Sequence, residues 1–331
     1  MQHTKTDVLG IGNAIVDVLA RTDDDFLAAH KLDKGTMHLI DEQTATSLYE
    51  AMGPGVEISG GSAANTIAGL ASFGASTAFV GKVRDDQLGQ VFGHDIRALG
   101  TRFETAPATD GAATARCLIL VTSDGQRTMN TFLGASIGLG PDDIEEDAVA
   151  GAGITYLEGY LWDPPEAKEA FVKAARIARG AGRQVALSLS DPFCVDRHRT
   201  EFRKLIKDEV DILFANEVEI CSLYETESFD DALQAARLDC RLAALTRSEH
   251  GCVIVEGQEV HVVPAAPVDK VVDTTGAGDQ FAAGFLFGLT RNQDLKTCGQ
   301  LGALAAAEVI GHMGARPEIE LVTLARKHAI L

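Results

Sequence analysis

Short apolar runs alternate with longer amphipathic segments along most of this chain, and this alternation constrains the fold more than any other feature. The run Val8–Gly12 is typical of a buried strand, whereas Leu88–Leu99 has the apolar spacing of a helix face. Alternating strands and helices form a mainly parallel sheet that helices cover on both faces. We therefore predict an α/β fold. Further strands are predicted at Ala78–Val80, Ile154–Glu158, Gln184–Leu189, Ile212–Ala215, Leu242–Thr246 and Cys252–Val255, and further helices at Ala63–Ser72, Pro165–Arg179, Glu217–Tyr224, Phe229–Ala236 and Gln280–Leu289.

Two stretches, Gly35–Asp41 and Ala112–Ser136, interrupt this alternation because their β-like runs are not separated by helices. Residues 123–126 form a turn signal between two such runs, which predicts a β-hairpin. We interpret the two stretches as a small sheet that projects from the main body. A surface hairpin without a function is the alternative.

Composition excludes several classes of protein. The 331 residues are 46% hydrophobic and 23% charged, close to the averages of globular proteins. A net charge of −19 argues against a nucleic acid or an anionic membrane as partner. No window approaches the roughly 20 apolar residues of a membrane span, and the polar segment before Val8 does not resemble a signal peptide. The six cysteines form no Cys-x-x-Cys pair, so we expect free thiols in a reducing cytoplasm.

The strongest functional signal is the segment Asp273–Phe281, with the sequence DTTGAGDQF. A glycine turn before an apolar helical pattern leaves backbone N–H groups without partners at the positive end of a helix dipole. Such a site binds phosphate or an anion that develops during a reaction. Asp279 would repel a bound phosphate, but it can remove the proton of a hydroxyl that attacks the phosphate. The alternative is that Asp279 is a helix N-cap.

A second glycine pair, Gly60 and Gly61, precedes the helix predicted from Ala63. Glycines let backbone amides approach a ligand, and Ser62 can cap the helix. The amide of Asn65, one turn into the helix, can reach a polyhydroxylated ligand. An ordinary turn before a capped helix is the alternative.

Further oxygen-bearing side chains follow apolar strands. The carboxylate of Asp17 can accept two hydrogen bonds from a vicinal diol such as that of ribose, although it also fits a solvated loop. Asn216 and Glu219, three positions apart on a predicted helix, face the same way. Their oxygen atoms suit Mg²⁺, which usually keeps several waters. The alternative for this pair is an ordinary helix cap.

Three partial motifs point to other functions and are set aside. The sequence GIG at 10–12 lacks the third glycine of a dinucleotide-binding fingerprint. The sequence GASIG at 134–138 matches the nucleophile elbow of serine hydrolases, but glycine and proline follow where that elbow needs a helix. The sequence GK at 81–82 lacks the spacing of a Walker A phosphate loop.

The sequences GGSAAN at 60–65, NEVE at 216–219 and DTTGAGDQF at 273–281 occur in this order. Together they resemble the signatures of the ribokinase (PfkB) family of sugar and nucleoside kinases, and the resemblance extends from about residue 7 to about residue 317. It implies one three-layer α/β/α domain over residues 1–331 with a mainly parallel central sheet. A small β-sheet lid, from segments of about 14–45 and 109–137, is expected to cover the substrate.

The resemblance also implies a kinase that uses ATP and Mg²⁺, with Asp279 as the general base. Arg116 and Arg127, on the lid, are candidates to neutralise phosphate charge on closure. The chain departs from the family near 246–251, where Ser248 replaces a glycine of the Thr-x-Gly-x-x-Gly loop and makes Arg247 and Ser248 weaker candidates for ATP contacts. The expected sets are the anion hole of Gly276, Ala277 and Gly278; the ribose site of Asn13, Asp17, Gly60, Gly61 and Asn65; the ATP and Mg²⁺ site of Asn216, Glu219, Thr246, Gly251 and Thr275; and a monovalent-cation site for K⁺ at Asp273, Thr275 and Gly314.

Within the family, the strings at 12–17, 187–193 and 211–217 are similar to those of adenosine kinases. The expected reaction is phosphorylation of the 5′-hydroxyl of adenosine to give AMP in purine salvage. A sugar kinase for ribose or fructose and a nucleoside-binding protein without turnover are the alternatives. A monomer or a homodimer is expected, because an exposed edge of the lid sheet can pair with a second copy. A purine base needs an apolar, partly aromatic slot, which we expect to be lined by Ile15, Met37, Leu133, Tyr160 and Trp162.

Overall fold

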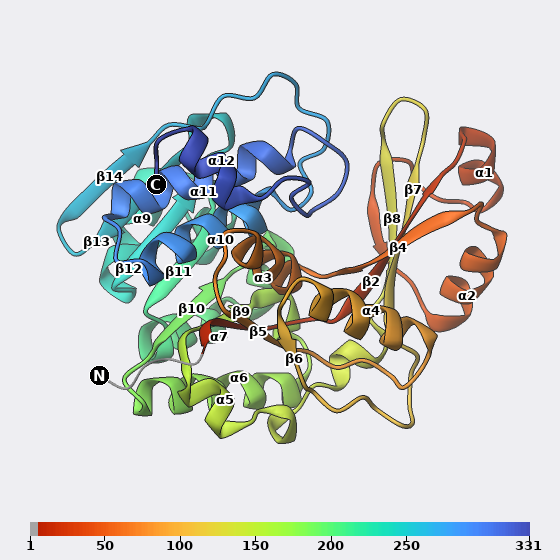
Figure 1. Ribbon diagram of the computed structural model, residues 1–331, viewed down its shortest axis with the longest axis horizontal. Coiled ribbons are helices and arrows are strands. Elements are labelled where there is room, and N and C mark those ends of the chain that lie inside the picture. Colours follow the sequence, from red (N-terminus) through yellow and green to blue (C-terminus); the bar gives the residue numbers. More distant parts are fainter. Residues whose placement is uncertain (1–5) are drawn as a thin grey trace.

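Two β-sheets of unequal size organise the protein in the computed structural model, which describes residues 6–331 (Figure 1). The larger sheet has nine strands in the order β14-β13-β12-β11-β10-β9-β1-β5-β6. Its strands pair in parallel from β12 to β6, and only β13 runs antiparallel to its neighbours, β12 and β14. The predicted α/β fold with a mainly parallel sheet is confirmed. The strands are β1 (Thr6–Ile11), β5 (Thr77–Val80), β6 (Arg102–Phe103), β9 (Ala152–Glu158), β10 (Gln184–Ser188), β11 (Ile212–Asn216), β12 (Leu242–Thr246), β13 (Cys252–Glu256) and β14 (Glu259–Val263).

Helices cover both faces of the large sheet because side chains alternate along each strand. On β1, Val8 belongs to the core under α3, α4, α10, α11 and α12, whereas its neighbour Leu9 belongs to the core under α5 to α9. Three aromatic side chains, Phe79, Phe285 and Phe171, are fully buried in these two cores. The helices are α3 (Ser62–Ser72), α4 (Gln87–Ala98), α5 (Glu146–Ala150), α6 (Pro165–Gly180), α7 (Pro192–Glu209), α8 (Glu217–Tyr224), α9 (Phe229–Asp239), α10 (Ala277–Thr290), α11 (Leu295–Val309) and α12 (Leu321–Lys327), with 3-10 turns η1 (Gly134–Gly138), η2 (Pro141–Asp143), η3 (Gly159–Trp162) and η4 (Ser248–His250).

The smaller sheet, on the right of Figure 1, has five strands in the order β3-β8-β7-β2-β4. Strands β7 and β8 form the predicted antiparallel hairpin. Strand β4 also belongs to this sheet, although it lies outside the two segments predicted from the sequence. Helix α2 covers the outer face of the small sheet, near Leu118 and Leu120. On the inner face, Cys117 and Ile119 line a cavity. The elements are β2 (Ile15–Arg21), β3 (Met37–Leu39), β4 (Gly55–Gly60), β7 (Ala115–Val121), β8 (Arg127–Phe132), α1 (Asp24–Ala29) and α2 (Glu42–Ala51).

Two expectations from composition can be compared with the structure. Within residues 6–331, no helix combines the length and apolar character that crossing a membrane requires. All six cysteines are free thiols, and all but Cys221 are buried.

Candidate active site

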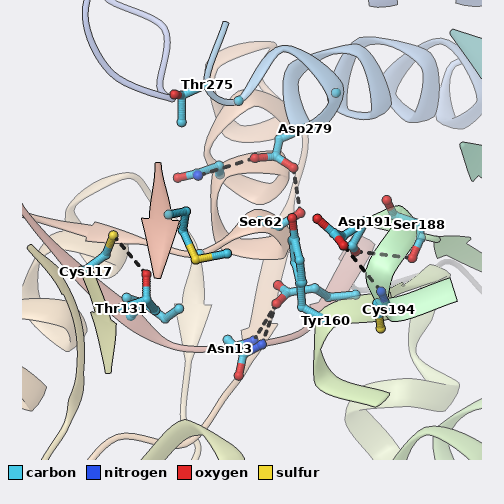
Figure 2. Close-up of a pocket in the computed structure, with 18 of the residues that line it drawn as sticks. Asn13, Ser62, Cys117, Thr131, Tyr160, Ser188, Asp191, Cys194, Thr275 and Asp279 are labelled. Carbon is cyan, nitrogen blue, oxygen red and sulfur yellow. Dashed lines mark hydrogen bonds between the residues drawn. The ribbon is translucent and has the colours of Figure 1, made fainter. Parts of the chain in front are cut away.

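A cavity of about 820 Å³ lies between the inner face of the small sheet and one edge of the large sheet. On the large-sheet side its wall includes Glu158, Ser188, Asn216 and Thr246, each of which ends a parallel strand. Ligands of open α/β sheets bind at the carboxyl ends of the strands, and this volume is ordinary for a small-molecule site. The location therefore makes this cavity the candidate active site (Figure 2).

The N-terminus of α10 forms one wall of the cavity. Gly276 is its N-cap at φ 79°, and a Cβ there would lie 2.7 Å from Cα and Cβ of Ala315, so only glycine fits this turn. The N–H of Ala277 donates to the Thr274 carbonyl (3.2 Å). No side chain caps α10, and a Cβ on Gly278 would meet no atom within 4 Å. The turn predicted as an anion hole thus presents the positive end of a helix to open space.

Asp279 lies in the first turn of α10 but does not cap the helix. Its Oδ1 accepts a hydrogen bond from the Ser62 hydroxyl (2.6 Å; Figure 2), and its Oδ2 accepts one from the Asn65 amide (3.4 Å). Burial raises the pKa of Asp279 to about 6, and the two hydrogen bonds limit this increase. Such a carboxylate is ionised at neutral pH and can still accept a proton from a hydroxyl. The N-cap interpretation of Asp279 is therefore wrong.

The N-terminus of α3 meets that of α10 across the cavity. Gly61 is the N-cap of α3 at φ 100°, and a Cβ there would overlap the Asn13 carbonyl. Gly60 does not line the cavity; a Cβ there would overlap the Asp17 carboxylate, so this glycine makes room for it. The expectation that Ser62 caps α3 is wrong, because Ser62 is already helical and its hydroxyl is directed at the carboxylate of α10.

The predicted ribose-binding side chains Asn13, Asp17 and Asn65 line the same cavity as Asp279. Burial raises the pKa of Asp17 to about 6, while the positive charges of Arg316 and Arg127 oppose this increase. When ionised, Asp17 offers acceptor oxygens to the hydroxyls of a diol. The structure thus gathers two carboxylates and two amides around one open space.

Sequence analysis did not identify Glu158, which is 1% exposed at the end of β9. Its Oε1 accepts hydrogen bonds from the backbone and side-chain amides of Asn13 (3.3 and 2.7 Å), and its Oε2 accepts one from the N–H of Ala63 (2.7 Å). Burial raises the pKa of Glu158 to about 7. Glu158 therefore joins the loop after β1 to the start of α3. The available signal in the sequence was an acidic residue at the end of an apolar strand.

The apolar part of the cavity contains most of the predicted base slot. Trp162 is the exception, because its ring packs against Phe171 and Phe202 with centroid distances of 5.9 and 5.6 Å. The 3-10 turn η3 directs Trp162 into the core under α6 and α7. The predicted slot residues that do line the cavity are Ile15, Met37, Leu133 and Tyr160.

Asn216 and Glu219 line the cavity at the start of α8, where they form a reciprocal capping box. The Asn216 side chain accepts from the Glu219 N–H (2.8 Å), and the Glu219 carboxylate accepts from the backbone and side-chain amides of Asn216 (2.9 and 2.7 Å). Burial raises the pKa of Glu219 to about 7. Because the oxygens of each side chain already accept hydrogen bonds from N–H groups of the other residue, they fit Mg²⁺ held through water and phosphate rather than directly. Residues 6–331 contain no group of three or more His, Cys, Asp or Glu side chains that could hold a metal ion.

Asp273 lies behind the anion turn, and its carboxylate is fully engaged. Oδ1 accepts from the N–H and hydroxyl of Thr275 (3.1 and 2.8 Å). Oδ2 accepts from the N–H of Gly314 (3.0 Å) and pairs with Arg127 (2.8 Å). These four partners occupy the lone-pair positions of the carboxylate, so a cation that bound it would have to displace one of them. Of the predicted cation-site residues, only Thr275 lines the cavity.

Several other predicted residues lie elsewhere. Arg116 differs from the expectation, because alternation along β7 turns it to the outer face of the small sheet, where it donates to Thr46 (2.7 Å). Thr246 lines the cavity, but Gly251 does not; at φ 83° its backbone packs against the Val263 carbonyl. Arg247 is held by an ion pair with the neighbouring helix α8 (3.0 Å) and does not line the cavity.

Comparisons with known proteins agree with this geometry. Residues 36–321 match the family model described as pfkB family carbohydrate kinase. The solved structure of a probable sugar kinase from Rhizobium etli CFN 42 is 51% identical, with a TM-score of 0.92, and the match covers 99% of this chain and 100% of that one. The adenosine kinase from Sinorhizobium meliloti is 56% identical, with a TM-score of 0.91, over 98% of this chain and 99% of that one.

A more distant relative also matches along nearly its whole length. The adenosine kinase of Saccharomyces cerevisiae is 27% identical over 92% of this chain and 94% of its own. The family match covers four of the five strands of the small sheet, all but β2, together with the capping box of α8 and the anion turn of α10. The chain therefore belongs to the pfkB family of carbohydrate kinases.

Proposed function

We propose that this kinase transfers the γ-phosphoryl group of ATP to the 5′-hydroxyl of adenosine and forms AMP. The observation that carries the proposal is the position of Asp279, an ionisable carboxylate at the mouth of an uncapped helix N-terminus. Asp17, which suits a ribose diol, lies in the same cavity. The 56% identity to the Sinorhizobium meliloti adenosine kinase supports a nucleoside as acceptor.

In the proposed reaction, Asp17, Asn13 and Asn65 hold the ribose and direct its 5′-hydroxyl at Asp279. Asp279 takes the hydroxyl proton while the 5′-oxygen forms a bond to the γ-phosphorus and the bond to the β-phosphate oxygen breaks, so that ADP leaves. The turn of Gly276, Ala277 and Gly278 faces the negative charge that develops on the transferred group.

Asn216 and Glu219 are the residues that would organise Mg²⁺ near the ATP phosphates, together with water. Bound Mg²⁺ would neutralise phosphate charge. Thr246 and Thr275, on the same wall, are proposed to contact ATP. Gly251 is proposed to act only by shaping its loop, because it lies outside the cavity.

We propose that the small sheet acts as a lid. Its inner face places Met37, Ile119 and Met129 over the cavity, and this apolar cover would exclude water that competes as acceptor. Met37 is 46% exposed, as expected for a side chain that becomes buried when a base is bound. The free cysteines fit the cytoplasm as the place of this reaction.

A sugar kinase is the second candidate, and the 51% identity to the probable sugar kinase from Rhizobium etli favours it. The apolar wall near Ile15 and Leu133 argues for a base, because a free sugar has less apolar surface than a purine to cover such a wall. A nucleoside-binding protein without turnover is the third candidate. Such a protein would not explain why an ionisable carboxylate, Asp279, lies beside an uncapped helix N-terminus.

The decisive experiment measures ADP release from ATP and Mg²⁺ with adenosine, inosine, ribose and fructose side by side. We expect turnover with adenosine and little with the free sugars. Leu133→Asp should raise the KM for adenosine, whereas Leu238→Asp, at a residue 85% exposed on α9, should leave it unchanged. Turnover with a free sugar alone would refute the nucleoside assignment, and ADP release with none of the four would refute the proposed reaction.

A further inference from the structure

We propose that Arg316 is a positioning residue that orients the amide of Asn65 toward Asp279 without touching the substrate. Arg316 follows α11 in the chain and does not line the cavity. No motif in the sequence points to it. The inference rests on the proposed function, because it takes Asp279 as the base.

The guanidinium of Arg316 fixes which way the Asn65 amide faces. Its Nε donates to Asn65 Oδ1 (3.3 Å), so the amide nitrogen is left to donate to Asp279 Oδ2 (3.4 Å). The reversed amide would place its oxygen against a carboxylate and its NH₂ group against a guanidinium, two repulsive contacts. Arg316 therefore selects the one orientation in which Asn65 supports an ionised Asp279.

Asp95 on α4 anchors the guanidinium. Its Oδ2 accepts from Arg316 Nη1 (3.1 Å) and from the N–H of Ser59 (2.8 Å), the residue before Gly60 on β4. The Arg316 side chain is only 14% exposed, so this pair is weakly screened by solvent. A charge-assisted bond to a carboxylate that is itself held on two elements gives the guanidinium one position.

The backbone around Arg316 is braced against the same site. Gln280, which follows Asp279 and is fully buried, donates through Nε2 to the carbonyls of both Asn65 and Ala315 (2.9 Å each). The N–H of Gly314 donates to Asp273 (3.0 Å) behind the anion turn. Segment 314–316 thus helps to fix the position of α3 relative to α10, and its last residue, Arg316, contacts the Asn65 amide.

The charge of Arg316 also acts on Asp17, an acidic neighbour of Asp279. Arg316 and Arg127 are the cations that oppose the raised pKa of the nearby Asp17. Loss of the oriented Asn65 donor would raise the pKa of Asp279, since that hydrogen bond lowers it. The titratable groups on which the charge of Asp279 acts include Asp17 on β2, Tyr156 and Glu158 on β9, Tyr160 on η3 and Glu219 on α8.

A double-mutant cycle tests the proposal. We would compare Arg316→Met, Asn65→Ala and the double variant, using the acceptor that the wild type phosphorylates best. Arg316→Met should lower kcat about 10-fold or more and move the acid limb of the pH profile to higher pH. The double variant should be no worse than Asn65→Ala, because both changes remove the same support. The matched control is Arg291→Met, which breaks another Arg–Asp pair at 3.1 Å, to Asp7, outside the cavity.

The proposal would be overturned if the decreases in kcat of Arg316→Met and Asn65→Ala multiplied in the double variant. It would also be overturned if Arg316→Met and Arg291→Met had the same kcat and the same pH profile. If Arg316→Met does not fold by circular dichroism, Asp95→Asn decides: a smaller upward shift of the acid limb supports the proposal, and an unchanged limb overturns it. A carboxyl ¹³C NMR titration of Asp279 in the wild type, Asp95→Asn and Arg316→Met gives a readout without turnover. A higher Asp279 pKa in the variants supports the positioning role even if no acceptor is phosphorylated. The absence of phosphorylation by itself refutes only the proposed function.

Discussion

The Ser62 hydroxyl donates a hydrogen bond to Asp279 Oδ1 across 2.6 Å, although the two residues are 217 positions apart in the chain. Ser62 is the first residue of α3, and Asp279 lies in the first turn of α10. Two helix N-termini therefore converge on one carboxylate, and both dipoles favour its ionised form. This convergence offsets part of the effect of burial, which raises the pKa of Asp279 to about 6.

Replacing Asp279 by Asn should abolish most turnover and leave nucleoside binding nearly intact. The variant keeps the shape of the side chain but cannot accept the hydroxyl proton, so kcat should fall about 10²- to 10⁴-fold. ADP release and calorimetric binding of adenosine measure the two effects. The matched control is Asp231→Asn, which changes the third residue of α9, an exposed site in the same helical position. A near-normal kcat for Asp279→Asn would remove the assignment of the base.

The pH profile should fall on its acid side. Protonation of Asp279 and Asp17, whose pKa values are each raised to about 6, should decrease kcat/KM as the pH drops through this value. Ser62→Ala should move the limb to higher pH, because the lost hydrogen bond lowers the pKa of Asp279. Initial rates at constant ionic strength measure both. A limb that stays in place in Ser62→Ala would contradict the electrostatic role of the hydroxyl.

The same carboxylates should make the unliganded protein less stable as the pH rises. The pKa of Asp279 is about 6 in the folded state and near the ordinary aspartate value of 3.8 when unfolded, so the native state binds more protons between these values. The free energy of unfolding should therefore decrease over this window, by at most about 3 kcal/mol for one group. Asp279→Asn should raise Tm more at pH 8 than near pH 4. An equal change in Tm at both pH values would contradict the inferred burial effect.

Two glycines of the anion turn should respond differently to a methyl group. Gly276→Ala places a Cβ at positive φ and 2.7 Å from Ala315 Cα, so it should lower the free energy of unfolding by about 1–3 kcal/mol. Gly278→Ala meets no atom within 4 Å and should leave stability unchanged, but its methyl group should crowd a bound phosphate and lower turnover. Denaturant unfolding and ADP release separate these effects. Equal stability of the two variants would contradict the close packing at Gly276.

Removal of Arg127 should create dependence on a monovalent cation. In the wild type, Arg127 completes the four partners of the Asp273 carboxylate, so exchange of K⁺ for tetramethylammonium should have little effect on turnover. Arg127→Gln opens one position, and K⁺ should then stimulate the variant. The control is Arg102→Gln, whose ion pair with Glu104 is exposed and distant in the fold. Strong stimulation of wild-type turnover by K⁺ would contradict this prediction, because K⁺ would then bind without an open position on Asp273.

Local patterns predicted much of the candidate site. The turn before α10 and the glycines before α3 were identifiable because backbone conformation at a helix start depends on the few residues around it. It was harder to predict which side chains of a short element face the cavity and which face the core. Tyr160 faces the cavity while Trp162, two residues later, enters the core, and a 3-10 turn has no strong apolar period that separates them.

The sequence by itself determined the α/β class, the bounds of seven of the nine strands of the large sheet to within two residues, and the presence of an acidic residue in the first turn of a helix that follows a glycine turn. Only the tertiary structure decided that Ser62 binds Asp279 instead of capping α3, that Glu158 holds Asn13, and that Arg316 reaches Asn65 across 251 positions. The physical reason is that capping and periodicity are local, whereas these contacts depend on strand order and helix packing. The pKa of a carboxylate likewise depends on burial, which no short stretch of sequence contains.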